Sequence, residues 1–283
     1  MSQIKLKFIG LALLLIANYF TWQAVGVWAD TSLRIFFLDV GQGDAILIRT
    51  PSHHTILVDG GPDQNVIAQL NRVMPLWNRH IDLLVLTHPQ ADHVTGLLDV
   101  LERFTVGEIL ATFEPYDSQT NSAWLSAALA GDHAINYADA ADDYQFGEVR
   151  WDTLHPLSQL LDDSEDVNEH SVVAKITYAG VSLLLTGDAG FPAEARLLDT
   201  YANLDVDILK VGHHGSRYAS SSEFLAATQP EVAVIQVGQN SFGHPTDETL
   251  GRLLNVGATI YRSDTEGLIE VVVTQTGYTV APR

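Results

Sequence analysis

The segment IDLLVLTHPQADH, residues 81–93, joins an apolar run to a cluster of metal-binding residue types. The run is typical of a strand buried on both faces of a sheet. His88, Asp92 and His93 follow it within a few positions, where ligands bind in open α/β sheets. Because imidazole and carboxylate together suit zinc, manganese or iron, the segment predicts a metal site. Taken alone, it would also fit a solvated polar loop that happens to carry two histidines.

Three further apolar runs end in the same residue types. LLLTGD ends at Asp188, DILKVGHHGS carries His213 and His214, and the run at residues 234–237 leads through a loop to His244. Gathering these groups in an apolar sheet without a cation would be costly, since carboxylates repel one another and desolvated charges are unfavourable. The four segments together favour a metal centre over a polar loop.

Strands and helices alternate along the chain, which predicts one α/β domain over residues 31–283. Residues 112–165 show no clear pattern and are interpreted as an insertion or long covering loops. The expected strands are 33–40, 45–49, 56–58, 81–86, 172–178, 181–185, 206–211, 232–237, 259–262 and 268–273, and the expected helices are 64–74, 192–204, 221–228 and 247–255.

The composition fits a globular protein and limits the possible partners. Of 283 residues, 46% are hydrophobic and none is cysteine, so any metal must be held by imidazole, carboxylate or amide groups. The formal charge of −20 repels polyanions and excludes bulk electrostatic binding of nucleic acid. A small anionic substrate, or a polymer end that enters a cleft, remains compatible with this charge.

Residues 1–30 differ from the rest of the chain. Lys5 and Lys7 precede an apolar run from Phe8 to Ala17, and a softer stretch continues to Ala29. This pattern predicts either a signal peptide cleaved after Ala29 or a single transmembrane anchor, with the uncleaved anchor slightly favoured over the signal peptide. A buried core helix is the remaining alternative. Either reading expects membrane contact through this segment and an extracytoplasmic domain.

Seven motifs follow one another in a fixed order: FLDVGQGDA (37–45), VDGG (58–61), THPQADH (87–93), NEHSVV (168–173), TGD (186–188), VGHHGS (211–216) and GHP (243–245). In this order they resemble the metallo-β-lactamase-like domain at the end of the competence protein ComEC and its stand-alone relatives. The resemblance covers about residues 33 to 273. It implies an αββα sandwich, preceded here by the N-terminal apolar helix, with a metal cleft at one edge.

The resemblance also implies roles for individual residues. His88 is similar to the ligand of a first metal site, Asp92 and His93 to ligands of a second, and Asp188 to the carboxylate that bridges them. The remaining second-site ligand is expected to be His213, with His214 as the alternative.

One position departs from the family pattern. Gln90 stands where many relatives have His or Asp, and an amide oxygen is the weaker ligand. His170 is a possible substitute for the additional histidine that many of these enzymes use. The expected cofactor is therefore one or two ions of zinc or manganese, and a single ion on the Asp92 and His93 side is an open alternative.

Other residues of the motifs have weaker indications. Asp59 would steady a ligand from behind or simply form a turn, and Asp44 is interpreted as structural. Ser216 and His244 are expected to face the substrate, with His244 as the acid for the leaving group.

The predicted reaction is hydrolysis by metal-bound hydroxide, with Asp188 orienting it and Asp92 beside it. The family makes a phosphodiester the leading substrate, in nucleic acid or in an envelope polymer. The alternatives are a lactone, thioester or β-lactam on the same metal, or a binding protein that lost catalysis through Gln90. A purely structural surface protein would explain residues 1–30 but not the histidines.

Overall fold

A computed structural model gives the structure of the chain. It describes residues 8–16, 18–19, 21, 30–75, 77–112, 116–131, 133–140, 142–157 and 166–283. Most of the expected leader at residues 1–30 lies outside these ranges, apart from a helix over residues 8–16 whose side chains are exposed. Within the described ranges, no helix has the length and apolar character that crossing a bilayer requires.

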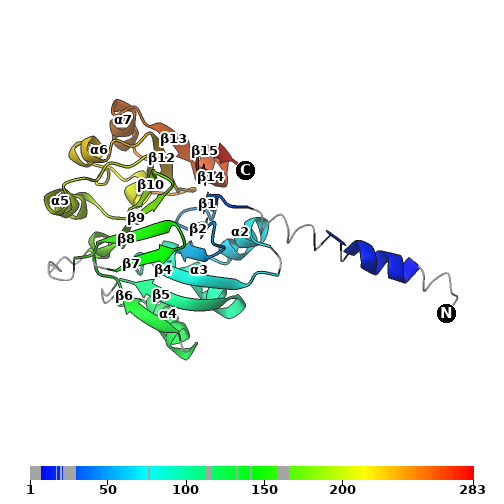
Figure 1. Ribbon diagram of the computed structural model, residues 1–283. Helices are drawn as coiled ribbons and strands as arrows, with labels where there is room; N and C mark the ends of the chain where they lie inside the picture. The colour runs from blue at the N-terminus through cyan, green and yellow to red at the C-terminus, as the bar shows by residue number, and fades with distance from the viewer. Residues whose placement is uncertain are drawn as a thin grey trace.

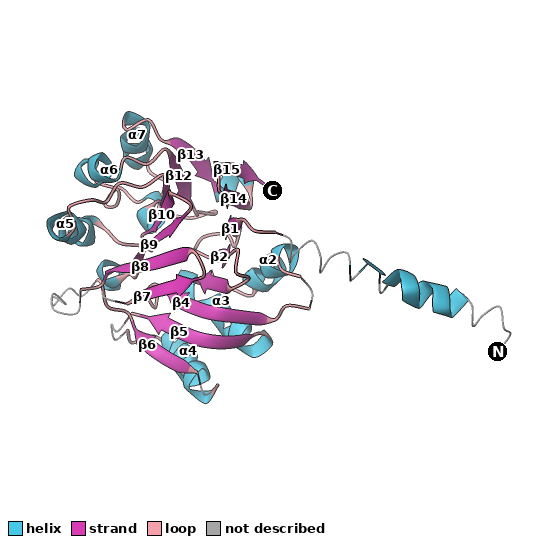
Figure 2. Ribbon diagram, in the orientation of Figure 1, coloured by secondary structure: helices cyan, strands magenta, loops and turns pink. Residues whose placement is uncertain are grey.

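Two β-sheets form the centre of the domain (Figures 1 and 2). The larger has the strand order β15-β14-β1-β2-β3-β4-β5-β6 and the smaller β13-β12-β11-β10-β9-β8-β7. The strands are β1 Leu33–Phe37, β2 Ile46–Arg49, β3 Thr55–Val58, β4 His80–Leu86, β5 Thr105–Ala111, β6 Ala134–Tyr137, β7 Asp143–Phe146, β8 Val149–His155, β9 Val173–Tyr178, β10 Val181–Leu185, β11 Ile208–Lys210, β12 Val232–Ile235, β13 Thr259–Arg262, β14 Ile269–Thr274 and β15 Gly277–Pro282.

Helices cover the outer face of each sheet, so the layers run αββα (Figure 2). One set of helices packs on the larger sheet and another on the smaller, each over an apolar cluster of its own. The first set is α2 Asn65–Val73, α3 Ala91–Arg103 and α4 Gln119–Ala130, and the second is α5 Phe191–Thr200, α6 Ser222–Thr228 and α7 Asp247–Asn255; the short α8 is Ser263–Glu266, and the 3-10 helices are η2 Val167–His170 and η3 Gly212–Gly215.

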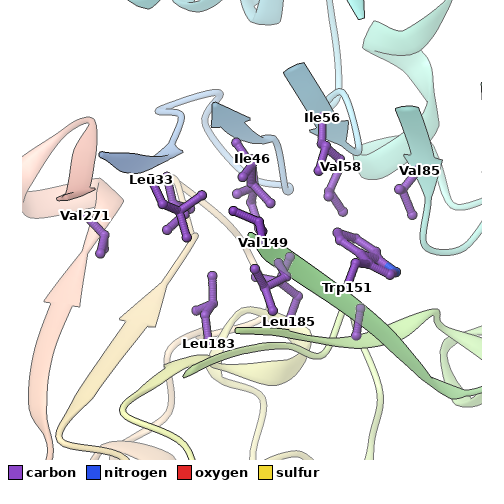
Figure 3. Packing of buried hydrophobic residues seen from close by; sticks show 14 of the residues in the cluster. Leu33, Ile46, Ile56, Val58, Val85, Val149, Trp151, Leu183, Leu185 and Val271 are labelled. Carbon is purple, nitrogen blue, oxygen red and sulfur yellow. The ribbon is translucent and has the colours of Figure 1, made fainter. Parts of the chain in front are cut away.

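The main core lies between the two sheets (Figure 3). Successive side chains of a strand point to opposite faces. In β1, Leu33 and Ile35 therefore enter this core, while Phe36 packs under the helices of the larger sheet. In β10, Leu183 enters the core and Leu184 packs under the helices of the smaller sheet. Both sheets are thus apolar on two faces, as the continuous runs of the sequence indicated.

Residues 112–165 are interpreted from the sequence as an insertion or long covering loops, and the expectation of loops is wrong for the described part of this range. This region contains α4, the edge strand β6 and the pair β7 and β8. The helix is rich in alanine and serine and has no marked apolar face, and β6 and β7 are half exposed at sheet edges. For this reason α4, β6 and β7 lack the hydrophobic periodicity from which helices and strands are recognised in a sequence.

Parallel strands bring the four polar motifs to one edge of the sandwich. β4 lies parallel to β3 and β5 in the larger sheet, and β10, β11 and β12 are parallel neighbours in the smaller sheet. The loops after these strands carry the histidines and aspartates of the sequence motifs. The carboxyl ends of both sheets therefore meet where the site forms.

Candidate metal centre

The loop after β4 delivers the first donors. His88 follows the strand directly, and Asp92 and His93 lie in the first turn of α3. His88 and His93 are fully buried, with ring centroids 4.1 Å apart. Gly43 packs so closely on this turn that a Cβ there would lie 2.1 Å from the Asp92 carbonyl oxygen. The glycine of the GQG motif therefore helps to fix the position of Asp92.

Asp188 lies at the centre of the site, with four imidazole nitrogens around one carboxylate oxygen. The distances from Asp188 Oδ2 to the Nε2 atoms are 3.3 Å for His214, 3.4 Å for His93, 3.9 Å for His213 and 4.0 Å for His88. The carboxylate is 1% exposed. The Ser171 hydroxyl accepts a hydrogen bond from the Asp188 backbone N–H at 3.1 Å, which holds this turn against the segment between η2 and β9.

His213 and His214 take an unusual backbone conformation. Both have positive φ, 46° and 52°, which is unfavourable for residues with a Cβ. As a result, the His214 ring turns inward and is buried, while the His213 side chain stays 30% exposed. His214 Nε2 also lies 3.3 Å from Asp92 Oδ2. The sequence favoured His213 as the second-site ligand, whereas the geometry favours His214.

The donor atoms fit a shared cation. Two ligand atoms held tetrahedrally by one ion at 2.0–2.2 Å are roughly 3.3–3.6 Å apart. Donor atoms of Asp92, His93 and His214 lie within 4.8 Å of one another, and so do those of His88, His93 and Asp188. Both oxygens of Asp188 are buried and have no hydrogen-bond partner within the described part of the chain. The same holds for Nε2 of His88, His93 and His214.

The electrostatics agree with a cation site. Burial alone would raise the pKa of Asp188. The charges of His214 and His93 outweigh burial, and the pKa of Asp188 lies well below its usual value. The same interactions overcome burial at the two histidines and raise the pKa of each well above its usual value. Burial and the charge of His93 lower the pKa of His88 to about 3, so that its ring is neutral at pH 7. Asp188 is thus stabilised by positive charge from the two rings, and a divalent ion bound in the same place could supply that charge instead.

Asp59 supports the site from behind. Its carboxylate accepts hydrogen bonds from the Thr87 backbone at 2.8 Å and the Thr87 hydroxyl at 2.6 Å, and it lies 2.8 Å from His93 Nδ1. A carboxylate in this place fixes the ring so that Nε2 points at the cation. Asp59 has a φ of 57°, a strained conformation for an aspartate.

Sequence reasoning missed the role of a buried ion pair below the cluster. Lys210 is 0% exposed, contacts the Asp44 carboxylate through Nζ and donates to the Gly187 carbonyl at 2.8 Å. Its ammonium lies 3.7 Å from Asp188 Oδ1, and Asp44 Oδ1 lies 3.4 Å from His214 Nδ1. The signal was present in the sequence, because a lysine inside an apolar strand must have a buried partner.

The first metal position has fewer donors than the second. Gln90 lies at the start of α3 and lines the cleft. Ser171 is committed to the Asp188 backbone. His170 is buried, and its carbonyl accepts a hydrogen bond from the Thr112 hydroxyl. Among the described histidines and carboxylates, the first position would therefore be held by donor atoms of His88 and Asp188, which group with His93.

A cleft of about 760 Å³ opens above the cluster. Ser216 and His244 line it, and the His244 ring lies 5.5 Å from that of His213. Burial and the charge of His213 lower the pKa of His244 to about 4. The ring is therefore neutral at pH 7 and could donate a hydrogen bond, whereas the acid role expected from the sequence requires a protonated ring.

Comparison with known proteins agrees with this geometry. Residues 38–239 match the family model of the Metallo-beta-lactamase superfamily. The chain belongs to this superfamily. It is 28% identical over 259 residues to ComE operon protein 3 of Bacillus subtilis (strain 168), and 29% identical over 265 residues to Competence protein ComA of Neisseria gonorrhoeae. These matches cover 84% and 92% of the chain but 32% and 35% of the relatives. The chain therefore spans about a third of the relatives' length.

A solved structure shows the same fold. The metallo-beta-lactamase fold protein YhfI from Bacillus subtilis superposes with a TM-score of 0.55 at 12% identity, covering 84% of this chain and 99% of that one. The αββα arrangement and the resemblance to ComEC-type competence proteins are both confirmed. A further relative, named a UPF0173 metal-dependent hydrolase, from Anoxybacillus flavithermus (strain DSM 21510 / WK1), is 20% identical over 192 residues, covering 64% of this chain and 82% of that protein.

Proposed function

We propose that the protein hydrolyses phosphodiester bonds with a divalent zinc or manganese ion held in this site. The observation that carries the proposal is the buried carboxylate of Asp188, with four imidazole nitrogens within 3.3–4.0 Å of one oxygen. The donors support one tightly held ion between Asp92, His93, His214 and Asp188. A weaker second position would use His88, Asp188 and the amide of Gln90.

When bound, such an ion lowers the pKa of water toward neutrality and polarises the bond under attack. The residues of the chain would supply the remaining chemistry. Asp188 would orient the attacking water and take its proton, since both its oxygens are free of hydrogen bonds from the described residues. Asp59 would hold the ring of His93, and the Gln236 carbonyl would hold His214 through Nδ1 at 2.9 Å.

The cleft supports a phosphodiester over a lactone or a thioester. Arg217, His213 and His244 line it and offer N–H groups to phosphate oxygens. Arg217 is notable because it places a cation beside the site in a chain of formal charge −20. A guanidinium forms strong charge-assisted hydrogen bonds with phosphate. A lactone or a thioester has no negative charge with which Arg217 could pair.

The test is hydrolysis of bis-p-nitrophenyl phosphate by the full-length protein loaded with zinc or manganese, compared with a lactone, a thioester and a β-lactam. Asp92→Asn should abolish turnover, and Asp99→Asn should not. Asp99 lies on the same helix and pairs with Arg103 on the surface. Turnover of acyl substrates alone would overturn the proposal in favour of an esterase or lactamase. Absence of bound metal after refolding with either ion would leave a binding protein.

We also propose that residues 1–30 direct the protein to the membrane and that the hydrolase domain acts outside the cytoplasm. The support is the pair of lysines followed by the apolar run from Phe8. Protease treatment of intact spheroplasts should degrade the domain or release it. Full protection until the cells are lysed would contradict this location.

A further inference from the structure

A second cavity, of about 330 Å³, lies at the opposite end of the strands from the metal cleft. Its walls come from the start of β1, the end of β2, the turn after β2 and the loop between α2 and β4. The loops of the metal site leave the other ends of these strands, since the GQGD segment follows β1 and precedes β2. The cavity is therefore separate from the site already described.

Two arginines oppose each other in this cavity. Arg34 of β1 and Arg49 of β2 are Cα partners in the antiparallel register, and both line the cavity. Directly opposed residues of neighbouring strands place their side chains on the same face, where like charges are destabilising. Both guanidinium groups are charged, because arginine does not lose its proton in proteins. Negative charge between them would therefore stabilise the pair.

The carboxylates of the chain pair with Arg34 and not with Arg49. Arg34 Nε lies 2.5 Å from Asp30, and its Nη1 lies 2.6 Å from Glu270. Among the described residues, no carboxylate lies within 4.0 Å of the Arg49 guanidinium, and its hydrogen bond is a long one, from Nη1 to the Val73 carbonyl at 3.4 Å. A guanidinium has five N–H groups. Most of those on Arg49 thus remain available to a ligand.

The surroundings of Arg49 disfavour an unpaired charge. The side chain is half-buried. Burial and the charge of Arg34 lower the pKa of Arg49, against the attraction of Asp30 and Glu270. A cation that is partly desolvated beside a like charge gains more from an anionic ligand than a fully exposed cation would.

The turn after β2 supplies further polar groups from a fixed backbone. His53 and His54 both line the cavity. The His53 N–H donates to the Thr50 carbonyl at 2.9 Å, and the Thr50 N–H donates to the His54 carbonyl at 3.0 Å. These hydrogen bonds hold the turn, so a ligand would find its donors already in place.

We propose that this cavity binds a phosphate group, which Arg49 holds from the side opposite Arg34. A guanidinium binds phosphate through two parallel, charge-assisted hydrogen bonds. The cavity lies at the small end of the usual range for ligand sites, about 300–1,000 Å³, so a phosphate with a small substituent fits. Because the chain has a formal charge of −20, these local cations and not the overall field would hold the anion.

The phosphate belongs either to a soluble ester or to a phospholipid headgroup. Trp77 lines the cavity and is 47% exposed, and tryptophan is enriched where proteins meet a membrane surface. Asp30, the last residue of the expected leader, also lines the cavity. The proposal is independent of the metal site and of the bond that the protein hydrolyses.

The experiment detects binding at the cavity itself, by fluorine NMR of the full-length protein labelled with fluorotryptophan, in EDTA. The Trp77 signal is identified by its loss in Trp77→Phe. The signals of Trp124 and Trp151, which are 2% and 1% exposed, are internal references. The probes are inorganic phosphate and dihexanoyl phosphatidic acid below its micelle-forming concentration. We expect a saturable shift of the Trp77 signal and steady reference signals.

Arg49→Gln should weaken this binding about tenfold or more, because a charged hydrogen-bond donor is lost. Arg150→Gln is the control, since Arg150 is 59% exposed and pairs with Asp143 on another strand pair. Equal affinity for both probes would identify a soluble phosphate ligand, and binding of the lipid alone would identify a headgroup. A Trp77 signal that moves with neither probe, or that moves equally in Arg49→Gln, would overturn the proposal.

Thermal unfolding distinguishes a ligand site from a structural role of Arg49. Without either probe, Arg49→Gln should not lower Tm, because the repulsion from Arg34 is removed. The probe that binds should raise Tm of the wild type and have a smaller effect on the variant. A variant with a lower Tm in the absence of probe, together with a wild-type Tm that neither probe raises, would show that Arg49 only supports the fold.

Discussion

Removal of the Lys210 ammonium tests the electrostatic structure under the site. In Lys210→Met, the buried Asp44 carboxylate loses its ion-pair partner, since Lys210 is 0% and Asp44 1% exposed. The charges of Asp44 and Asp188 outweigh burial and raise the pKa of Lys210, so the group is charged at pH 7. Removing one partner of a buried pair costs about 3–5 kcal/mol. At about 2–4 °C per kcal/mol, Tm should fall by roughly 6–20 °C.

The assay is thermal unfolding followed by circular dichroism at pH 7 in EDTA, so that no metal contributes. Lys175→Met is the matched control: its ammonium bonds the Asp205 carbonyl at an exposed site, and the expected loss is about 1 kcal/mol or less. The double variant Asp44→Asn with Lys210→Met should recover part of the loss, because no unpaired charge remains. A Tm of Lys210→Met within about 2 °C of wild type would refute the ion-pair argument.

Further predictions concern the donors themselves. His214→Ala should weaken metal binding at least about tenfold more than His213→Ala, measured by competition with a chromophoric chelator; equal losses would contradict the assignment of His214. Asp59→Asn should weaken it about 10–100-fold, with Asp63→Asn as the exposed control. In the metal-free protein, the raised pKa values of His93 and His214 give stability that is complete below about pH 6.5 and lost as pH rises through their folded values. Tm in EDTA should therefore fall at alkaline pH while metal affinity rises, and a Tm that rises with pH would contradict this.

The sequence was informative where one physical signal dominated. β10, β13 and α7 have the bounds that hydrophobic periodicity predicted, residues 181–185, 259–262 and 247–255. Some other elements were placed correctly but are shorter, such as β11, which is limited to Ile208–Lys210. The elements α3, β5 and β15 were not predicted. The donors were recognised because His and Asp after a buried strand are costly without a cation. Side-chain type and order along the chain were sufficient for this inference.

What could not be read from the sequence depends on backbone conformation and on pairing. The choice between His213 and His214 follows from two consecutive residues at positive φ, which neither side chain reveals. The pair of Asp44 and Lys210 joins a loop after β1 to a strand of the other sheet. Lys210 in an apolar strand indicates that a buried partner exists, but the identity of that partner depends on how the two sheets pack, and no local pattern records that packing.

The two exposed aromatic side chains that line the cleft, Tyr218 and Phe242, show the same difference between what sequence and structure reveal. Tyr218 directly follows a recognised motif and Phe242 directly precedes one, yet a sequence does not show which rings are buried. Only the folded chain shows that both lie in solvent beside the metal donors.

The central claim is that distant parts of the chain hold one cation between them. Elemental analysis of the purified full-length protein tests it most directly, with Asp188→Asn and His214→Ala as variants and Asp99→Asn as control. We expect near-stoichiometric zinc or manganese in the wild type and the control, and loss of metal in both variants at retained secondary structure. A wild-type protein that binds no metal after incubation with either ion, or variants that bind as much metal as the wild type, would contradict the account.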